Sequence, residues 1–173
     1  MREITSAIAN KIIKGYNEEI EHLYAVEQAQ MTYTQVEGVD PVKPEYNFAE
    51  TRNAIRVLEA KVLELKHELN MFNSRTEIPE LGMTIDQALI RMAQLSTEKK
   101  RLEAMRKIQP RTVNSGYMGR ASNRVEYTVA NFSLSEVEDK YNHVTSKLNQ
   151  IQLGLDRINN TEIFVVEDAL IND

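Results

Sequence analysis

The sequence predicts a mainly α protein: four long helices in an antiparallel, coiled-coil-like bundle, with a small β-hairpin between the third and fourth helices. The first observation is a heptad seam in residues 134–158, formed by Leu134, Val137, Tyr141, Val144, Leu148, Ile151, Leu155 and Ile158. The second is a similar seam of Ile55, Leu58, Val62, Leu65, Leu69 and Phe72. The third is the loss of helical periodicity in residues 111–132. A helix buries such a seam only against another helix, so we expect these two seams to be partners, either within one chain or between two chains.

The first helix is predicted over residues 3 to about 31. Its apolar stripe is broader than a heptad seam and contains Ile8, Ile12, Ile13, Tyr16, Ile20, Leu23 and Tyr24, as on a helix with two neighbours. The acids Glu18, Glu19, Glu21 and Glu27 are expected on its solvated face.

Residues 32–46 form a connection, because Gly38, Asp40-Pro41 and Pro44 forbid a continuous helix. Tyr33 and Val36 favour a short strand within it. The family-like body of the chain is expected to begin at residue 47 and to extend to residue 173.

Capping signals define the other helices. Asn47 with Glu50 begins a helix over about 48–73, and Thr84 with Gln87 begins a third that continues to about residue 108, before Pro110. The stripe of the third helix contains Ile85, Leu89, Met92, Leu95, Leu102 and Met105 and is interrupted by Lys99. Ser133 with Glu136 is a capping box for the fourth helix.

Two segments are β-prone. Val125, Tyr127 and Val129 alternate with polar residues, and Asn114-Ser115-Gly116 is typical of a turn, so we predict a hairpin over 111–130. Residues 163–166 form a short β-prone run near the C-terminus.

The second and fourth helices end alike. Leu69, Phe72 and Asn73 precede Thr76-Glu77-Ile78, and Leu155, Ile158 and Asn159 precede Thr161-Glu162-Ile163. Each segment is interpreted as a copy of the same supersecondary unit, a heptad helix followed by a short extended segment. The similarity indicates either an internal duplication or chance.

These residues also carry a family resemblance. In several segments the chain resembles a group of small bacterial helical proteins, some of which are named septicolysin. The segments are Leu69-Asn70, Asn73, Thr76, the run Thr84-Ile85-Asp86-Gln87-Ala88-Leu89, the segment 120–132 and Ile158-Asn159-Asn160-Thr161. The resemblance covers roughly residues 50–166 and implies a mostly helical protein with a small β element. The group has no established activity, so it implies no functional residues.

Composition excludes several classes of protein. The 173 residues suit one domain, 1–173, and 42% hydrophobic residues exclude wholesale disorder. With no Cys there is no disulfide framework, thiolate metal site or Cys nucleophile, and the net charge of −5 argues against a uniformly basic surface. The chain has no run of apolar residues as long as a membrane span. We therefore expect a cytoplasmic protein with no membrane contact.

A metal site and an enzyme are both disfavoured. Two Glu-x-x-His pairs, Glu19 with His22 and Glu64 with His67, have the spacing of di-iron bundles, but they lie off the apolar stripes. His143, four residues after Asp139, is also off the seam. No phosphate loop, nucleophile elbow or His–carboxylate cluster is evident, so we expect no catalytic residues, no metal and no cofactor.

A basic cluster is the better functional candidate. Eight basic residues and one acid, Glu103, lie within residues 99–124, so this segment carries +7 and the rest of the chain −12. Possible contacts to a phosphate or nucleic acid are Lys100, Arg101, Arg111, Tyr117, Arg120 and Arg124. The alternative is that the basic residues complement the dipole of the third helix and pair with acidic residues on neighbouring helices.

Two functions therefore stay open. The first is a structural or protein-interaction module that forms a homo-oligomer through its helical seams, with another protein as a further partner. The second is a module that binds nucleic acid or a phosphate ligand through the basic hairpin, residues 99–124.

Overall fold

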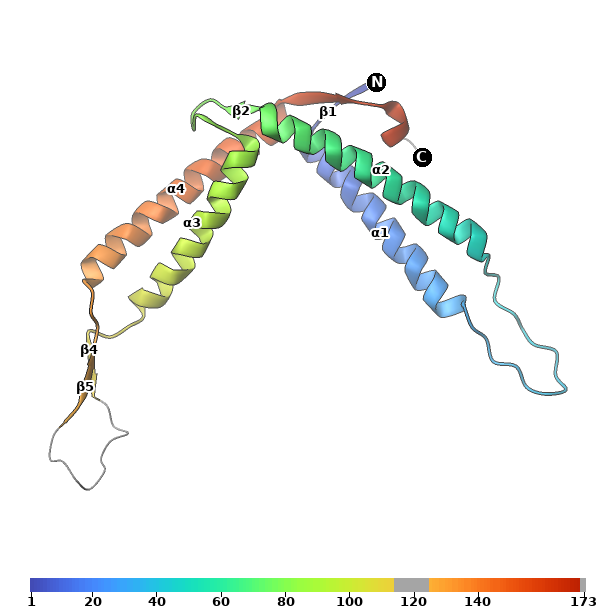
Figure 1. The fold of residues 1–173 in the computed structure, drawn as a ribbon, viewed down its shortest axis with the longest axis horizontal. Coiled ribbons are helices and arrows are strands. Elements are labelled where there is room, and N and C mark those ends of the chain that lie inside the picture. The colour runs from blue at the N-terminus through green and yellow to red at the C-terminus, as the bar shows by residue number, and fades with distance from the viewer. Residues whose placement is uncertain (114–124, 172–173) are drawn as a thin grey trace. The chain divides into compact units, whose positions relative to one another are not determined.

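A computed structural model describes residues 1–113 and 125–171. The helices in these ranges are α1 (Ser6–Gln30), α2 (Phe48–Arg75), α3 (Ile85–Arg106) and α4 (Leu134–Thr161), with a short 3-10 helix, η2, at Asp168–Leu170 (Figure 1). The strands are β1 (Arg2–Thr5), β2 (Glu77–Ile78), β3 (Met83–Thr84), β4 (Arg111–Val113), β5 (Tyr127–Val129) and β6 (Ile163–Val166). The predicted fold class, mainly α with a hairpin between the third and fourth helices, is confirmed.

The predicted helix starts are confirmed by their caps. The side chain of Asn47 accepts hydrogen bonds from the backbone of Ala49 and Glu50, and Ser133 Oγ accepts from the N–H of Glu136. Thr84 and Gln87 form a complete capping box at the start of α3. These contacts satisfy N–H groups that the first turn of a helix leaves without partners.

The N-terminal residues differ from the prediction. Residues 2–5 are a strand rather than the start of the first helix, and they pair antiparallel with β6, so that Ile4 lies opposite Phe164. Helix α1 begins at Ser6, because the side chain of Thr5 accepts a hydrogen bond from the N–H of Ile8 and caps it. The β-prone run at 163–166 is thus a strand as predicted, and its partner is the N-terminus.

The connection at 31–47 contains no strand, so the predicted strand at Tyr33 and Val36 is wrong. Its backbone turns at Val36–Val39, where the N–H of Val39 donates to the carbonyl of Val36 and Gly38 has φ of 81°. A positive φ at the third residue of such a turn favours glycine.

The expected single domain contains two compact units. The first, unit 1, comprises Met1–Thr76 and Arg157–Asp173, and the second, unit 2, comprises Glu77–Asp156. Each unit contains an antiparallel pair of helices and a two-stranded sheet, β1–β6 in unit 1 and β2–β3 in unit 2. Unit 2 also carries the β4–β5 hairpin.

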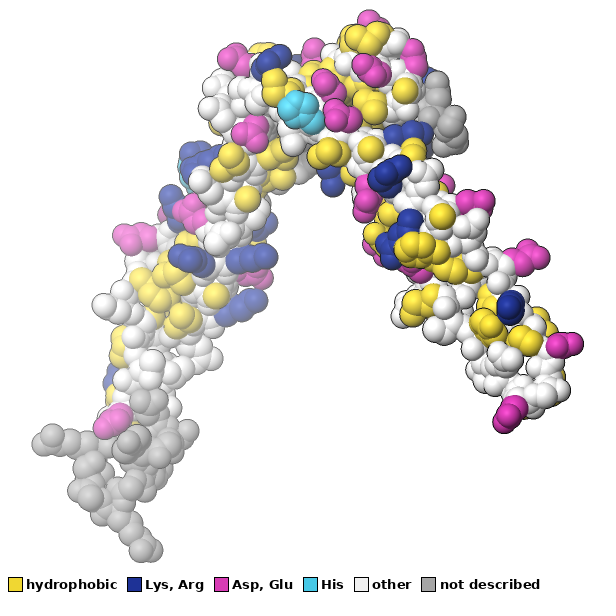
Figure 2. Space-filling model, turned by 45° about the vertical axis from the view of Figure 1, so that its right-hand side comes forward, with side chains coloured by type: hydrophobic (Ala, Val, Ile, Leu, Met, Phe, Trp, Pro, Cys, Tyr) yellow, Lys and Arg dark blue, Asp and Glu magenta, His cyan; other side chains and the backbone are white. Residues whose placement is uncertain are grey.

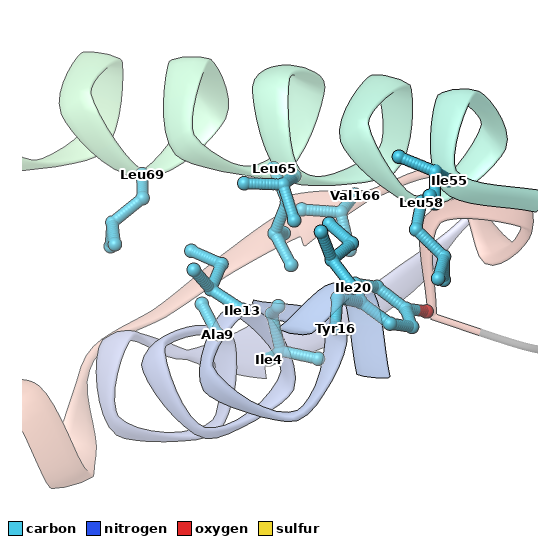
Figure 3. Packing of buried hydrophobic residues seen from close by; sticks show 11 residues of the cluster. Ile4, Ala9, Ile13, Tyr16, Ile20, Ile55, Leu58, Leu65, Leu69 and Val166 are labelled. Atoms are coloured by element: carbon cyan, nitrogen blue, oxygen red, sulfur yellow. The ribbon is translucent and has the colours of Figure 1, made fainter. Parts of the chain in front are cut away.

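The core of unit 1 is the interface between α1 and α2, closed by β1 and β6 (Figure 3). The predicted α2 seam is buried there against Ala9, Ile13, Tyr16 and Ile20 of α1. The expected pairing of the α2 seam with the seam of residues 134–158 is therefore wrong within the chain. Phe72, the last seam residue, stacks on Phe164 of β6 with ring centroids 4.8 Å apart.

The core of unit 2 lies between α3 and α4. Its buried apolar residues are Ile78, Ile85, Ala88, Leu95, Val137, Val144, Ile151 and Leu155. Gly154 lets α4 approach β2 closely, because a Cβ at this position would lie 3.0 Å from Cγ2 of Ile78. Most of the predicted seam of α4 is thus buried within the chain.

The two units repeat one arrangement. Thr5 and Thr84 cap the first helix of each pair, and the fully buried Ala9 and Ala88 follow four residues later. In each pair the second helix leads into a short strand, as its end in the sequence predicts, but that strand belongs to the other unit: β2 follows α2 and pairs with β3, whereas β6 follows α4 and pairs with β1. The repeated supersecondary unit is confirmed, and its origin by duplication stays a prediction.

Candidate functional site

The predicted basic site is only partly described by the structure. Lys100 and Arg101 lie exposed on α3, and Arg111 is the first residue of β4. Tyr117, Arg120 and Arg124 lie outside the described residues. Among the described ranges, Lys100 and Arg101 form no salt bridge.

Other members of the basic cluster are engaged inside unit 2. Nε of Arg106 lies 2.5 Å from Oε2 of Glu138 on α4, its Nη2 donates to Oε1 of the same carboxylate at 3.0 Å, and its guanidinium lies 4.1 Å from the ring centroid of Tyr141. Lys99, which interrupts the predicted seam, lies 5.5 Å from the same ring. Lys107 pairs with Glu103 one turn earlier. Arg106 thus pairs with an acidic residue on the neighbouring helix, as the structural alternative for the basic cluster predicted, and Lys99 also contacts α4, whereas the Lys107–Glu103 pair lies along α3.

The β4–β5 hairpin has two unlike faces. Its register pairs Arg111 with Val129 and Val113 with Tyr127, so these four side chains share one face, whereas Thr112 and Thr128 share the other. The guanidinium of Arg111 lies 3.5 Å from the ring centroid of Tyr127. Every residue of both strands is exposed. An isolated two-stranded hairpin is only marginally stable in water, so this face is suited to contact with another molecule.

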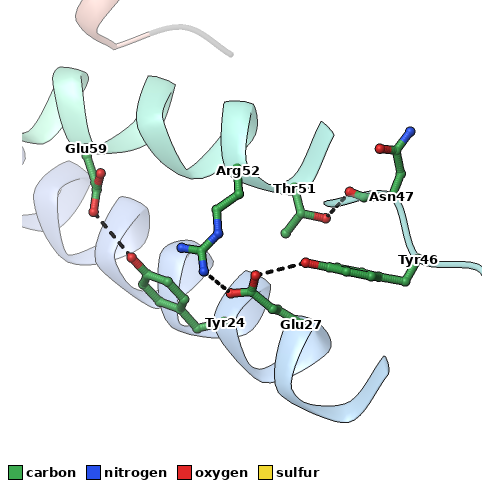
Figure 4. A network of polar contacts seen from close by, with 7 residues as sticks. All are labelled: Tyr24, Glu27, Tyr46, Asn47, Thr51, Arg52 and Glu59. Atoms are coloured by element: carbon green, nitrogen blue, oxygen red, sulfur yellow. Dashed lines mark hydrogen bonds and ion pairs between the residues drawn. The ribbon is translucent and has the colours of Figure 1, made fainter. Parts of the chain in front are cut away.

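Unit 1 contains a polar site that the sequence analysis missed (Figure 4). Glu27 is 9% exposed, lies between α1 and α2, and pairs with Arg52 at 2.8 Å. The hydroxyl of Tyr46 donates to its other oxygen at 2.8 Å. The expectation that Glu27 belongs to the solvated face is therefore wrong. The signal was present, since Glu27 continues the steps of three and four residues from Ile13, Tyr16, Ile20 and Leu23.

The Glu27–Arg52 pair has an equivalent in unit 2 with the charges reversed. Glu27 and Arg106 each lie 22 residues after the threonine that caps their helix. Arg52 and Glu138 each lie five residues after Asn47 and Ser133, the residues that cap α2 and α4. Each helix pair is thus joined at the same place by one ion pair, with the acid on the first helix in unit 1 and on the second helix in unit 2.

The environment of Tyr46 raises the pKa of its phenol. Partial desolvation is the main cause, followed by the hydrogen bond to Glu27 and the negative charge of that carboxylate, while Arg52 opposes them. The folded state therefore favours the neutral phenol. Its contribution to stability is present below the usual phenol pKa of about 10 and is lost as the pH rises through the raised value.

We expect an ultraviolet titration of the full chain to show a tyrosine that ionises above pH 10, after the usual phenol range. Tyr46→Phe should remove this late-titrating group while leaving Glu27 paired with Arg52. An unchanged upper end of the titration in Tyr46→Phe would contradict the assignment.

The Glu-x-x-His pairs lie on the helices without converging. His22, Glu64 and His67 are exposed, and so is His143 on α4. Within residues 1–113 and 125–171, no group of three or more His, Asp and Glu side chains is placed to hold a metal ion. In the same ranges, no helix is long and apolar enough to cross a membrane.

Comparisons with known proteins describe the fold. No family model matches the chain, and no curated protein matches it. The chain is similar to the crystal structure of a functionally unknown conserved protein from Corynebacterium diphtheriae, with a TM-score of 0.69 and 20% sequence identity, over 95% of this chain and 100% of that chain. At this identity the likeness shows a shared mainly helical fold and nothing of the function.

Proposed function

We propose that this chain is a structural or protein-interaction module that acts as a homo-oligomer. The observation that carries the proposal is the set of exposed apolar side chains at the connections between paired helices. They are Met31, Tyr33, Val36, Val39 and Val42 in unit 1, and Val113, Val125, Tyr127 and Val129 in unit 2. Grouped apolar side chains on a surface are typical of protein–protein contact sites.

The helical seams are poor candidates for this self-association. Leu65 and Val144 are almost completely buried within a single chain, as are most other seam residues. Because the seams already have partners, the proposed oligomer uses the connections in their place. Figure 2 shows hydrophobic side chains beside acidic and basic ones on the surface of the α1–α2 pair.

The proposal is tested by measuring the mass of the full chain in solution by sedimentation velocity over a wide concentration range. A homo-oligomer should show a mass above the 19.9 kDa of one chain, and the mass should rise with concentration. A mass of one chain at every concentration would contradict it. The chain is assigned no catalytic role.

Nucleic-acid or phosphate binding is the second candidate, favoured by the exposed Lys100, Arg101 and Arg111. It is tested by fluorescence anisotropy with a mixed-sequence single strand and a duplex, at low and near-physiological salt. A phosphate-binding site should lose affinity steeply with salt and in the combined Arg111→Ala, Arg120→Ala and Arg124→Ala variant. Absence of binding at both salt concentrations would exclude this candidate.

A further inference from the structure

We infer that the connection at residues 31–47 of one copy docks on the apolar face of the β4–β5 hairpin of a second copy. We call the first surface the acidic connection. We call the second, formed by Arg111, Val113, Tyr127 and Val129, the hairpin face. The inference rests on the proposed self-association and names the two surfaces that make it.

The hairpin face has the composition of a contact site. Val113 is 58% exposed and Val129 is 60% exposed, although apolar β-branched side chains are usually buried. Both lie on the same face of the β4–β5 hairpin as Tyr127. Arginine and tyrosine are enriched among residues that dominate binding energy at interfaces. The Arg111–Tyr127 stack therefore places a cation beside exposed apolar surface.

The acidic connection offers matching apolar groups. Val36 is 63% exposed and Val42 is 93% exposed, with Val39 and Tyr33 exposed between and before them. Two backbone hydrogen bonds within the described residues begin between positions 32 and 46, from Val39 to Val36 and from Tyr46 to Pro44. The backbone of an irregular segment of this kind can pair with the open edge of a ribbon.

The charges of the two surfaces are opposite. Residues 31–47 contain three acids, Glu37, Asp40 and Glu45, and one base, Lys43, for a net charge of −2. Arg111 is the one charged residue among the four that form the hairpin face, so this face carries +1. A contact between two like surfaces would bring like charges together, so charge complementarity favours the contact between unlike surfaces.

We assign the occupant as a second copy because the proposed function is self-association and the two surfaces carry opposite charges. Within unit 1 no described residue covers Val36 or Val42, and within unit 2 none covers Val113 or Val129. A contact between unlike surfaces is heterologous, and it closes into a ring or continues as an open chain of copies.

The first test uses charge reversal in the full chain. Variant A carries Glu37→Lys and Asp40→Lys, and variant B carries Lys107→Glu and Arg111→Glu. Each variant has two surfaces of like charge, so self-association should weaken at least about tenfold. An equimolar mixture of A and B again offers opposite charges at both contacts, so association should return to within a few-fold of the original chain.

The control carries Glu19→Lys and Glu64→Lys, which make the same charge change as variant A at exposed positions on α1 and α2. It should associate as the original chain does. Undiminished association of A and B would overturn the docking inference and leave the proposed oligomer standing. Failure of the mixture to recover would also overturn the docking inference. A monomeric original chain would instead remove the proposed function itself.

The second test uses the absence of cysteine from the chain. Val39→Cys, mixed with Val113→Cys under mild oxidation, should give a disulfide-linked pair in which each partner carries a different substitution. Thr112→Cys, on the opposite face of the hairpin, is the matched control and should crosslink at least several-fold less. Equal crosslinking from Val113→Cys and Thr112→Cys would overturn the assignment of the face.

Discussion

Leu65→Ala is expected to lower the free energy of unfolding by about 2–5 kcal/mol, because it removes buried methyl groups and leaves a cavity. Leu65 is 0% exposed and lies on the α2 seam among Ala9, Ile13 and Val166 in the core of unit 1. Urea denaturation followed by circular dichroism at 222 nm measures the loss directly.

Leu63→Ala is the matched control for this substitution. Leu63 lies on the same helix and allows the same Leu→Ala substitution, but it is 67% exposed. It should cost no more than about 0.5 kcal/mol, as is usual for surface substitutions. Similar losses in the two variants would mean that the α2 seam does not pack against α1 as described.

Glu27→Arg is expected to destabilise unit 1 by about 1–3 kcal/mol, because it places a second guanidinium beside Arg52 in the partly buried space between α1 and α2. The loss is smaller than for a fully buried pair, since nearly half of the Arg52 side chain is exposed. Adding Arg52→Glu should restore most of it. The doubly reversed chain then has the charge order that Arg106 and Glu138 already have in unit 2.

The interaction is measured as a double-mutant cycle in which each substitution is also made alone. Lys14→Glu with Glu18→Lys is the control cycle, because these two residues form an ion pair on the exposed face of α1. Its coupling should be below about 0.5 kcal/mol, as for other exposed pairs one turn apart. No rescue in the Glu27→Arg, Arg52→Glu chain would contradict the equivalence of the two pairs.

The candidate site was predictable only in part. Lys100, Arg101 and Arg111 stand out in the sequence because a run of like charges is visible without a fold. The roles of Arg106 and Glu27 are not visible in this way, since each depends on a partner from another helix. An acid on an amphipathic helix is usually solvated, and only its position on the apolar stripe separates Glu27 from the other acids.

The sequence by itself determined the local elements. Helix caps, heptad spacing and the alternation of β-branched residues all act between residues close in the chain. Local physical chemistry therefore determines the hairpin and the first residues of the helices that are capped by Asn47, Thr84 and Ser133. The same holds for the repeated ends of α2 and α4.

Only the tertiary structure decided which elements pair. One heptad seam is compatible with almost any other, so the seams alone could not assign α2 to α1. Residues 2–5 form a strand because β6, at the other end of the chain, supplies their hydrogen-bond partners. A local pattern predicts which side chains of a segment must be buried, whereas the segment that packs against them depends on the whole fold.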